Sequence, residues 1–178
     1  MANYEHGPLD AANFEQVVAE YAERLYNIAY RITGATSDAE DAVQEAFINA
    51  YRHLAQFRGE ANPRTWLYRI TVNAALQRVR ERAPREYLTE PADELDDARD
   101  WSTASHDPAT AAELREQLEN AFAALAPDYR AAVILRDVEG LSAREAAAVL
   151  QINEQALKSR LHRGRRLLRE LLGEYLRD

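Results

Sequence analysis

Cysteine is absent from the 178-residue sequence, which excludes disulfides, thiolate metal sites and cysteine nucleophiles. The four histidines are scattered along the chain and show no metal-ligand spacing with carboxylates. They are His6, His53, His106 and His162. No other nucleophile or acid–base constellation occurs, so an enzyme is the least expected class of protein. We therefore predict a non-catalytic protein that needs no metal ion or other cofactor.

Long hydrophobic runs are also missing. The N-terminal stretch MANYEHGPLDAANFEQ has no basic region followed by an apolar core. No apolar run approaches the roughly 20 residues that cross a bilayer. We therefore expect a cytoplasmic protein without membrane insertion. No stretch alternates between apolar and polar residues for long enough to form a strand, so we predict an all-α fold.

Positive charge is in short supply, because 22 Lys and Arg residues stand against 30 Asp and Glu residues, for a formal net charge of -8. This balance argues against polyanion binding by the surface as a whole. Any contact with nucleic acid must come from local basic patches.

Apolar residues recur at helical spacing in the first half of the chain. They predict a first helix over Phe14 to Thr33 that ends at Gly34. Ser37 and Glu40 resemble a capping box that opens a second amphipathic helix, which continues to Leu54. The polar side of this second helix is acidic and suits a basic partner helix, although a solvated face needs no partner.

A third helix is predicted from Asn62 as the N-cap and Pro63 at the first position, and it ends near Ala83 and Pro84. Cations and aromatic residues are interleaved along it, as in proteins that hold unpaired nucleic acid. The residues concerned are Arg64, Thr65, Trp66, Tyr68, Arg69, Asn73, Arg78, Arg80 and Arg82. The alternative is that Trp66 and Tyr68 are packing residues.

Helical periodicity fails from Pro84 to Pro108. Between Ala83 and Ala112 there are eight acidic residues and only two arginines. This composition is typical of a self-repelling, flexible linker. We predict a flexible N-terminus over residues 1–12, a first helical domain over 13–83, an acidic flexible linker over 84–108 and a second helical domain over 109–178.

The second domain begins with two predicted helices. Asp107 and Pro108 cap a helix that continues through Ala124, and Pro127 with Asp128 opens another that contains Val138. A helix-turn-helix follows. It is indicated by a C-cap at Gly140, a capping box from Ser142 to Glu145, a tight turn over Gln151 to Asn153 and an N-cap at Asn153.

The helix after Asn153 is rich in arginine. It contains six Lys or Arg residues between Lys158 and Arg169 and no acid, within an acidic protein. One apolar stripe is predicted to dock this helix, and it consists of Leu157, Leu161, Leu168 and Leu171. The cations would face solvent, either as a plain solvated surface or as a nucleic-acid footprint. The preceding turn favours the footprint.

Three stretches together resemble a bacterial RNA polymerase sigma factor of the extracytoplasmic-function group, which is group IV of the sigma-70 family. They are DAEDAVQEAFINAYRHL (38–54), FRGEANPRTWLYRITVNAAL (57–76) and LAPDYRAAVILRDVEGLSAREAAAVLQINEQALKSRLHRGRRLLREL (125–171). The resemblance implies a promoter-specificity subunit with a region two domain and a region four domain. It also implies core RNA polymerase, promoter DNA and an anti-sigma factor as partners.

Residue roles are carried over from the family by matching positions. The second helix matches the one that docks on the clamp helices of the polymerase beta-prime subunit, through Asp38, Asp41, Gln44, Glu45 and Asn49. Residues 57–62 match the loop that captures a flipped base of the minus 10 element, and residues 64–82 match the helix that reads and helps melt it. The candidate contacts are Phe57, Arg58, Asn62, Arg64, Trp66, Arg69, Asn73, Gln77, Arg78 and Arg80.

Residues 125–171 match the domain that reads the minus 35 element and touches the beta flap. Its candidate DNA contacts are Glu154, Gln155, Lys158, Ser159, Arg160, His162, Arg163 and Arg166. Gln77 stands where the family commonly has an acid, Gln151 where it has glycine, and residues 155–157 depart from a small-residue and Thr-Val pattern. A left-handed backbone at Gln151 would cost roughly 1 kcal/mol.

Two other functions are compatible with parts of the sequence. A sigma-like decoy would bind an anti-sigma factor without recruiting polymerase, but it would not need the basic, aromatic third helix. An autonomous helix-turn-helix repressor would leave the first domain and the linker unexplained.

Overall fold

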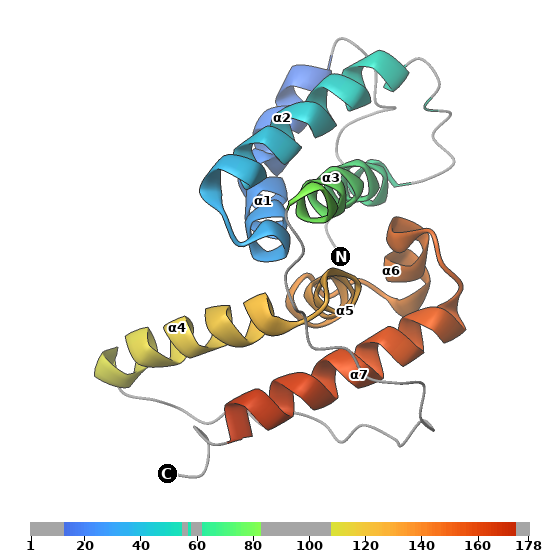
Figure 1. The fold of residues 1–178 in the computed structure, drawn as a ribbon. Coiled ribbons are helices and arrows are strands. Elements are labelled where there is room, and N and C mark those ends of the chain that lie inside the picture. The colour runs from blue at the N-terminus through green and yellow to red at the C-terminus, as the bar shows by residue number, and fades with distance from the viewer. Residues whose placement is uncertain (1–12, 55–56, 58–61, 83–107, 174–178) are drawn as a thin grey trace. The chain divides into compact units, whose positions relative to one another are not determined.

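A computed structural model of the protein describes residues 13–54, 57, 62–82 and 108–173 (Figure 1). None of these residues forms a β-strand, which confirms the predicted all-α class. The helices form two compact units, one built mainly on residues 13–82 and the other mainly on residues 108–147 and 152–173. The flexible N-terminus predicted for residues 1–12 and most of the flexible linker predicted for residues 84–108 lie outside the described residues.

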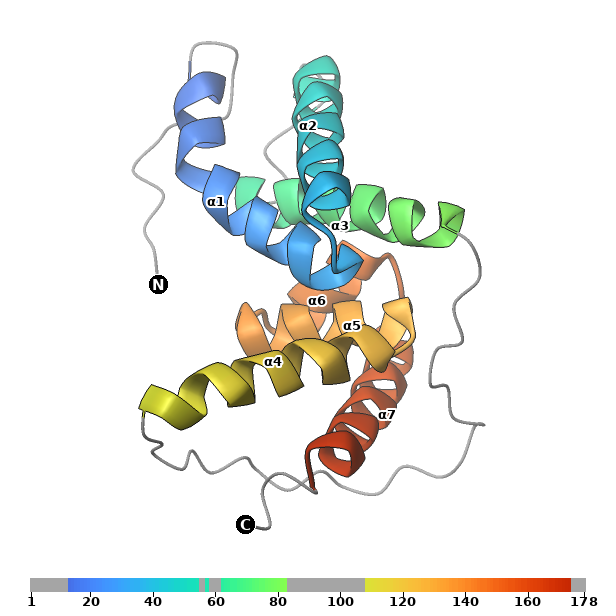
Figure 2. The ribbon, with the colours of Figure 1, turned by 60° about the vertical axis from the view of Figure 1, so that its left-hand side comes forward.

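The first unit contains α1 (Phe14–Thr33), α2 (Thr36–His53) and α3 (Pro63–Glu81), and each of these helices packs against the other two. Figure 2 shows α3 crossing α1 and α2. Alanines on α2 allow the close approach of larger residues from α1 and α3. The buried side chains include Leu25, Ile28 and Ile32 of α1, Ala39, Ala42, Ala46 and Ala50 of α2, and Leu67, Val72 and Ala75 of α3.

The helix ends in this unit are capped as the sequence predicts, with one exception. Gly34 has a φ of +69° and donates its N–H to Tyr30 O at 2.7 Å, as predicted for the end of α1. Asn62 Oδ1 accepts from Arg64 N at 2.9 Å, which confirms the predicted cap of α3. The capping box predicted at Ser37 is wrong. The backbone carbonyl of Ala35 already accepts from Ala39 N at 3.0 Å, so the N-cap is Ala35, two residues before Ser37, and it makes no side-chain cap.

The second unit contains α4 (Pro108–Ala124), α5 (Pro127–Val133), a π-helical turn η2 (Ile134–Val138), α6 (Ala143–Leu150) and α7 (Glu154–Gly173). Helix α7 packs against α4 and α5. The sequence predicts an uninterrupted helix to Val138 and gives no sign of the π-turn. Within it, Glu139 N reaches back five residues to Ile134 O at 2.9 Å.

The apolar face of α7 differs from the predicted leucine stripe. Leu157, Leu161 and Leu168 are buried as predicted, but Leu171 is 39% exposed in the last turn of the helix. Three residues complete the buried face in its place, namely Gly164, Leu167 and Leu172. A Cβ on Gly164 would lie 2.9 Å from Val133 Cγ2 and 3.3 Å from Tyr129 O, so the glycine permits the close approach of α5.

Arg130 on α5 holds the end of α4. Its side chain is buried, and Nη2 donates to Ala123 O at 2.7 Å and to Leu125 O at 3.0 Å. Ala123 lies in the last turn of α4 and Leu125 directly follows the helix, where intrahelical donors are missing. The guanidinium therefore acts as a C-cap supplied by another helix, which sequence patterns do not reveal.

Candidate nucleic-acid and polymerase surfaces

The helix-turn-helix forms as the sequence predicts. Ser142 N donates to Glu145 Oε2 at 2.8 Å and Glu145 N donates to Ser142 Oγ at 3.2 Å, which confirms the capping box. Gln151 adopts a φ of +56°, so the turn forms even though its left-handed residue is not glycine. Asn153 Oδ1 then accepts from Ala156 N at 2.7 Å and caps α7.

The first turns of α7 present polar groups to solvent. Glu154, Gln155 and Lys158 are exposed, whereas Leu157 is fully buried on the other side of the helix. Ser159 donates its hydroxyl to Gln155 O at 3.1 Å, so its oxygen can still accept a hydrogen bond. An acid, an amide and an amine at a helix tip are groups that can distinguish base edges in a major groove.

The cations of α7 fall into two sets. The first set has acidic partners: Arg160 lies 3.6 Å from Asp128, Arg166 lies 3.1 Å from Glu170, and Arg165 holds both oxygens of Asp137 at 2.9 and 2.6 Å. The second set has no ion pair within the described part of the chain, and it contains Lys158, Arg163 and Arg169. Lys158 and Arg163, which lie in the first three turns of α7, are therefore the better candidates for contacts with phosphate, because no ion pair must be broken first.

The pair between Arg165 and Asp137 also fixes the π-turn. Asp137 lies in η2, and neighbouring Arg136 donates to Leu141 O in the segment that leads to α6. Arg165, which the sequence predicts to face solvent with the other cations of α7, is thus paired with an acid of η2 and is only 25% exposed.

On α3, the aromatic residues proposed to hold unpaired bases are buried. Tyr68 is fully buried and Trp66 is 8% exposed, so the packing alternative describes both rings. The Trp66 ring lies 4.9 Å from the half-buried Phe57 ring. Trp66 therefore supports Phe57, which stands at the predicted base-capturing loop. Arg58 of that loop lies outside the described residues.

A polar strip remains exposed on α3. Arg69, Asn73, Gln77 and Arg80 follow one another at three- to four-residue spacing, which places them along one side of the helix. Asn73, Gln77 and Arg80 are exposed and Arg69 is half-buried. Gln77 Nε2 donates to Glu81 Oε1 at 2.8 Å. The amide oxygen of Gln77 can therefore still accept a hydrogen bond from another group.

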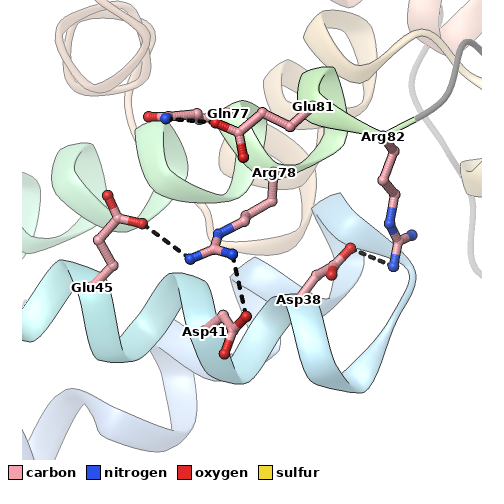
Figure 3. A network of polar contacts seen from close by, with 7 residues as sticks. All are labelled: Asp38, Asp41, Glu45, Gln77, Arg78, Glu81 and Arg82. Carbon is pink, nitrogen blue, oxygen red and sulfur yellow. Dashed lines mark hydrogen bonds and ion pairs between the residues drawn. The ribbon is translucent and has the colours of Figure 1, made fainter.

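Arg78 lies on a different side of α3 from this strip (Figure 3). Its guanidinium points toward α2 and lies 3.2 Å from Asp41 and 3.4 Å from Glu45. Both acids are predicted polymerase contacts, and Arg78 is a predicted DNA contact. The structure thus brings together residues that the sequence assigns to two different partners.

The predicted docking surface on α2 contains an apolar residue that sequence reasoning missed. Ile48 is 44% exposed, and it follows Asp41, Gln44 and Glu45 at helical spacing on the same side of α2. Its exposure was detectable in the sequence, because the buried side of α2 is already occupied by alanines. Asp38 differs from its neighbours on this helix, because its side chain is only 19% exposed and pairs with Arg82.

No group of three or more His, Cys, Asp or Glu residues that could hold a metal ion occurs in the part of the chain that the structure describes. Among the same residues, no helix is both long enough and apolar enough to span a bilayer.

Comparison with known proteins gives matches in both units. Residues 17–85 match the family described as Sigma-70 region 2, and residues 115–168 match Sigma-70, region 4. The chain is 31% identical to the ECF RNA polymerase sigma factor SigW of Bacillus subtilis, over 92% of this chain and 90% of SigW. It is 36% identical to the ECF RNA polymerase sigma factor SigE of Mycolicibacterium smegmatis, over 92% of this chain and 63% of SigE.

Two solved structures of protein complexes contain chains similar to this one. CnrH, in complex with the cytosolic domain of CnrY, matches with a TM-score of 0.67 and 26% identity, over 93% of this chain and 90% of CnrH. The sigma factor RpoE of Bartonella quintana, in complex with the anti-sigma factor NepR, matches with a TM-score of 0.65 over 92% of this chain and 98% of RpoE. Its 24% identity supports the fold alone.

Proposed function

The chain belongs to the sigma-70 family as a sigma factor of the extracytoplasmic-function group, and from this premise we propose how it confers promoter choice on RNA polymerase. It acts as a non-catalytic specificity subunit in the cytoplasm, where the polymerase and promoter DNA are found. The observation that carries the proposal is that two polar helix faces, one on α3 and one on α7, stand exposed in two separate units.

The minus 35 element is read by the N-terminal turns of α7. Glu154 and Gln155 contact base edges, since a carboxylate accepts from cytosine and an amide pairs with adenine. Lys158, Ser159, His162 and Arg163 bind the flanking phosphates, which position the helix. Arg160 and Arg166 reach phosphate only by leaving Asp128 and Glu170, so their contribution to affinity is smaller.

The minus 10 element is bound by the strip on α3 and by the loop before it. Arg69 and Arg80 follow the backbone of an unpaired strand, while Asn73 and Gln77 supply hydrogen bonds to its bases. Phe57, supported by the Trp66 ring, forms one wall of the pocket for a flipped base. Asn62 and Arg64 contribute at the start of the helix.

Core polymerase docks on α2, through Asp41, Gln44, Glu45, Ile48 and Asn49. The acids suit a basic helix of the beta-prime clamp, and Ile48 supplies the apolar contact that such an interface needs at its centre. The region four domain touches the beta flap, and the acidic linker at 84–108 joins the two DNA-binding domains. An anti-sigma factor is a further partner, which would hold the protein until a stress signal releases it.

Mapping of transcript start sites after expression of the protein tests this function. We expect new start sites preceded by one shared pair of sequence elements near minus 10 and minus 35. A Lys158→Ala/Arg163→Ala variant at the same protein level should lose most of these starts. New starts without shared elements, or no new starts at all, would contradict the proposal.

A further inference from the structure

Arg78 occupies the carboxylates that the polymerase would bind. Its Nη1 lies 3.2 Å from Asp41 Oδ2 and its Nη2 lies 3.4 Å from Glu45 Oε2. One guanidinium thus bridges two acids that are one helical turn apart on α2 (Figure 3). The acidic surface of α2 is therefore partly neutralised within the protein before any partner arrives.

The arginine that directly follows α3 makes a less exposed ion pair with α2. Arg82 pairs with Asp38, whose side chain is only 19% exposed, and it also donates to Thr33 O at 3.4 Å. Arg82 thereby ties the end of α1 and the start of α2 to α3. The side chains of Asp41 and Glu45 are 53% and 38% exposed, so an incoming cation can still reach them.

We propose that Arg78 is an internal competitor of the polymerase, which must release Asp41 and Glu45 before a basic helix of the polymerase can pair with them. This inference rests on the proposed docking surface of α2. Exposed ion pairs contribute little free energy each, so the polymerase can break these two pairs at a small cost in affinity. Arg78 therefore lowers the affinity for core polymerase and sets how strongly docking depends on salt.

The competition is separate from DNA recognition. Figure 3 shows Gln77 of the α3 strip pointing away from α2, whereas Arg78 points toward α2. Substitution of Arg78 therefore changes docking on the polymerase without removing a residue from the DNA strip.

The test is a titration of the full-length, N-terminally labelled protein with core polymerase in the absence of DNA. Arg78→Gln is expected to lower the Kd about two- to fivefold, because it removes one or two exposed ion pairs that oppose docking. The gain should shrink at about 0.5 M salt, where the Debye length falls to about 4 Å. Circular dichroism checks folding, and Arg78→Lys, which keeps the charge but cannot bridge two acids, should give an intermediate Kd.

Two controls separate this effect from a change of net charge. Arg80→Gln removes the same charge from the DNA strip on α3 and should leave the Kd for polymerase unchanged. Asp41→Asn/Glu45→Gln should weaken docking, and Arg78→Gln should then have no further effect.

The outcomes distinguish the two proposals. If Asp41→Asn/Glu45→Gln weakens docking but Arg78→Gln leaves the Kd unchanged or raises it, the competition is overturned and the docking surface stands. An equal gain from Arg80→Gln also overturns the competition, since it would show a general charge effect. If the acid replacements leave docking unchanged, both the docking surface and the competition are wrong.

Discussion

Single residues in this protein divide into those that hold a unit together and those that face a partner. Gly164 is of the first kind, because a Cβ at this position would lie 2.9 Å from Val133 Cγ2 and 3.3 Å from a backbone oxygen of α5. A side chain can shift, but the backbone oxygen of Tyr129 cannot move without α5.

Gly164→Ala is therefore expected to lower the free energy of unfolding by about 1–3 kcal/mol, despite the higher helix propensity of alanine. Denaturant unfolding followed by circular dichroism measures this change. Gly173→Ala is a matched control, because a Cβ there meets no atom within 4 Å. Equal or greater stability for Gly164→Ala would show that α5 and α7 do not pack this closely.

Lys158 and Arg163 are of the second kind, and their substitution is predicted to affect DNA binding alone. Lys158→Ala/Arg163→Ala should weaken binding to minus 35 DNA at every sequence tested, because phosphate contacts do not discriminate between bases. The slope of log K against log salt should become shallower by about 0.9 for each lost contact.

The control for this prediction is Arg169→Ala, which removes an exposed cation four turns from the tip of α7. It should change the salt slope less than Lys158→Ala does. An unchanged slope in the double variant would contradict a role in phosphate binding for Lys158 and Arg163.

At the scale of elements, the turn of the helix-turn-helix shows that this motif can form with a non-glycine residue at its left-handed position. Gln151 has a φ of +56°, in the region that favours glycine. Ile152 N donates to Ala147 O at 3.0 Å across the same turn, which holds the chain there. Together with the cap at Asn153, this hydrogen bond offsets the free-energy cost of the left-handed backbone at Gln151.

Gln151→Gly should consequently raise the free energy of unfolding by up to about 1 kcal/mol, since glycine adopts this backbone without a steric penalty. Thermal unfolding of both proteins measures the difference, with Gln155→Gly in α7 as a control that should destabilise by about 1 kcal/mol. Destabilisation by Gln151→Gly would mean that the backbone at this turn is not strained.

Local signals in the sequence were sufficient to predict most of the helix ends. The residues that cap these ends make hydrogen bonds within a few positions of themselves, so adjacent residues are enough to recognise them. They are Gly34, the Asn62–Pro63 pair, the Ser142–Glu145 box and Asn153. The Ser37 box does not form because α2 already begins at Thr36, where the carbonyl of Ala35 accepts the first helical hydrogen bond. The π-turn has no comparable local signal.

Contacts between helices were harder to predict. The leucine spacing of α7 does not show where neighbouring helices stop covering it, and so Leu171 was wrongly placed in the core. Arg78 and Arg82 looked like part of one cationic helix, because charge patterns along a sequence do not show which neighbour each side chain faces. The pairing with α2 emerges only when the two helices are packed.

At the scale of the whole molecule, the acidic net charge and the local basic surfaces have different effects on DNA binding. The excess acid between Ala83 and Ala112 disfavours non-specific binding to DNA, and the proposed function assigns DNA contacts to exposed groups on α3 and α7. If both proposed surfaces bind DNA, their presence on one chain raises the effective concentration of the second surface once the first is bound. Promoter choice therefore depends on both surfaces and on the polymerase that holds them.

The central claim is tested most directly by run-off transcription with purified core polymerase and a template that carries both promoter elements mapped for this protein. We predict transcripts from the full template, and at least a tenfold loss when either element is replaced, since each mismatched base pair costs about 1–3 kcal/mol. Core polymerase alone should give no specific transcript. Specific initiation that persists after replacement of either element, or absence of initiation from the full template, would contradict the assignment of the two DNA-binding surfaces.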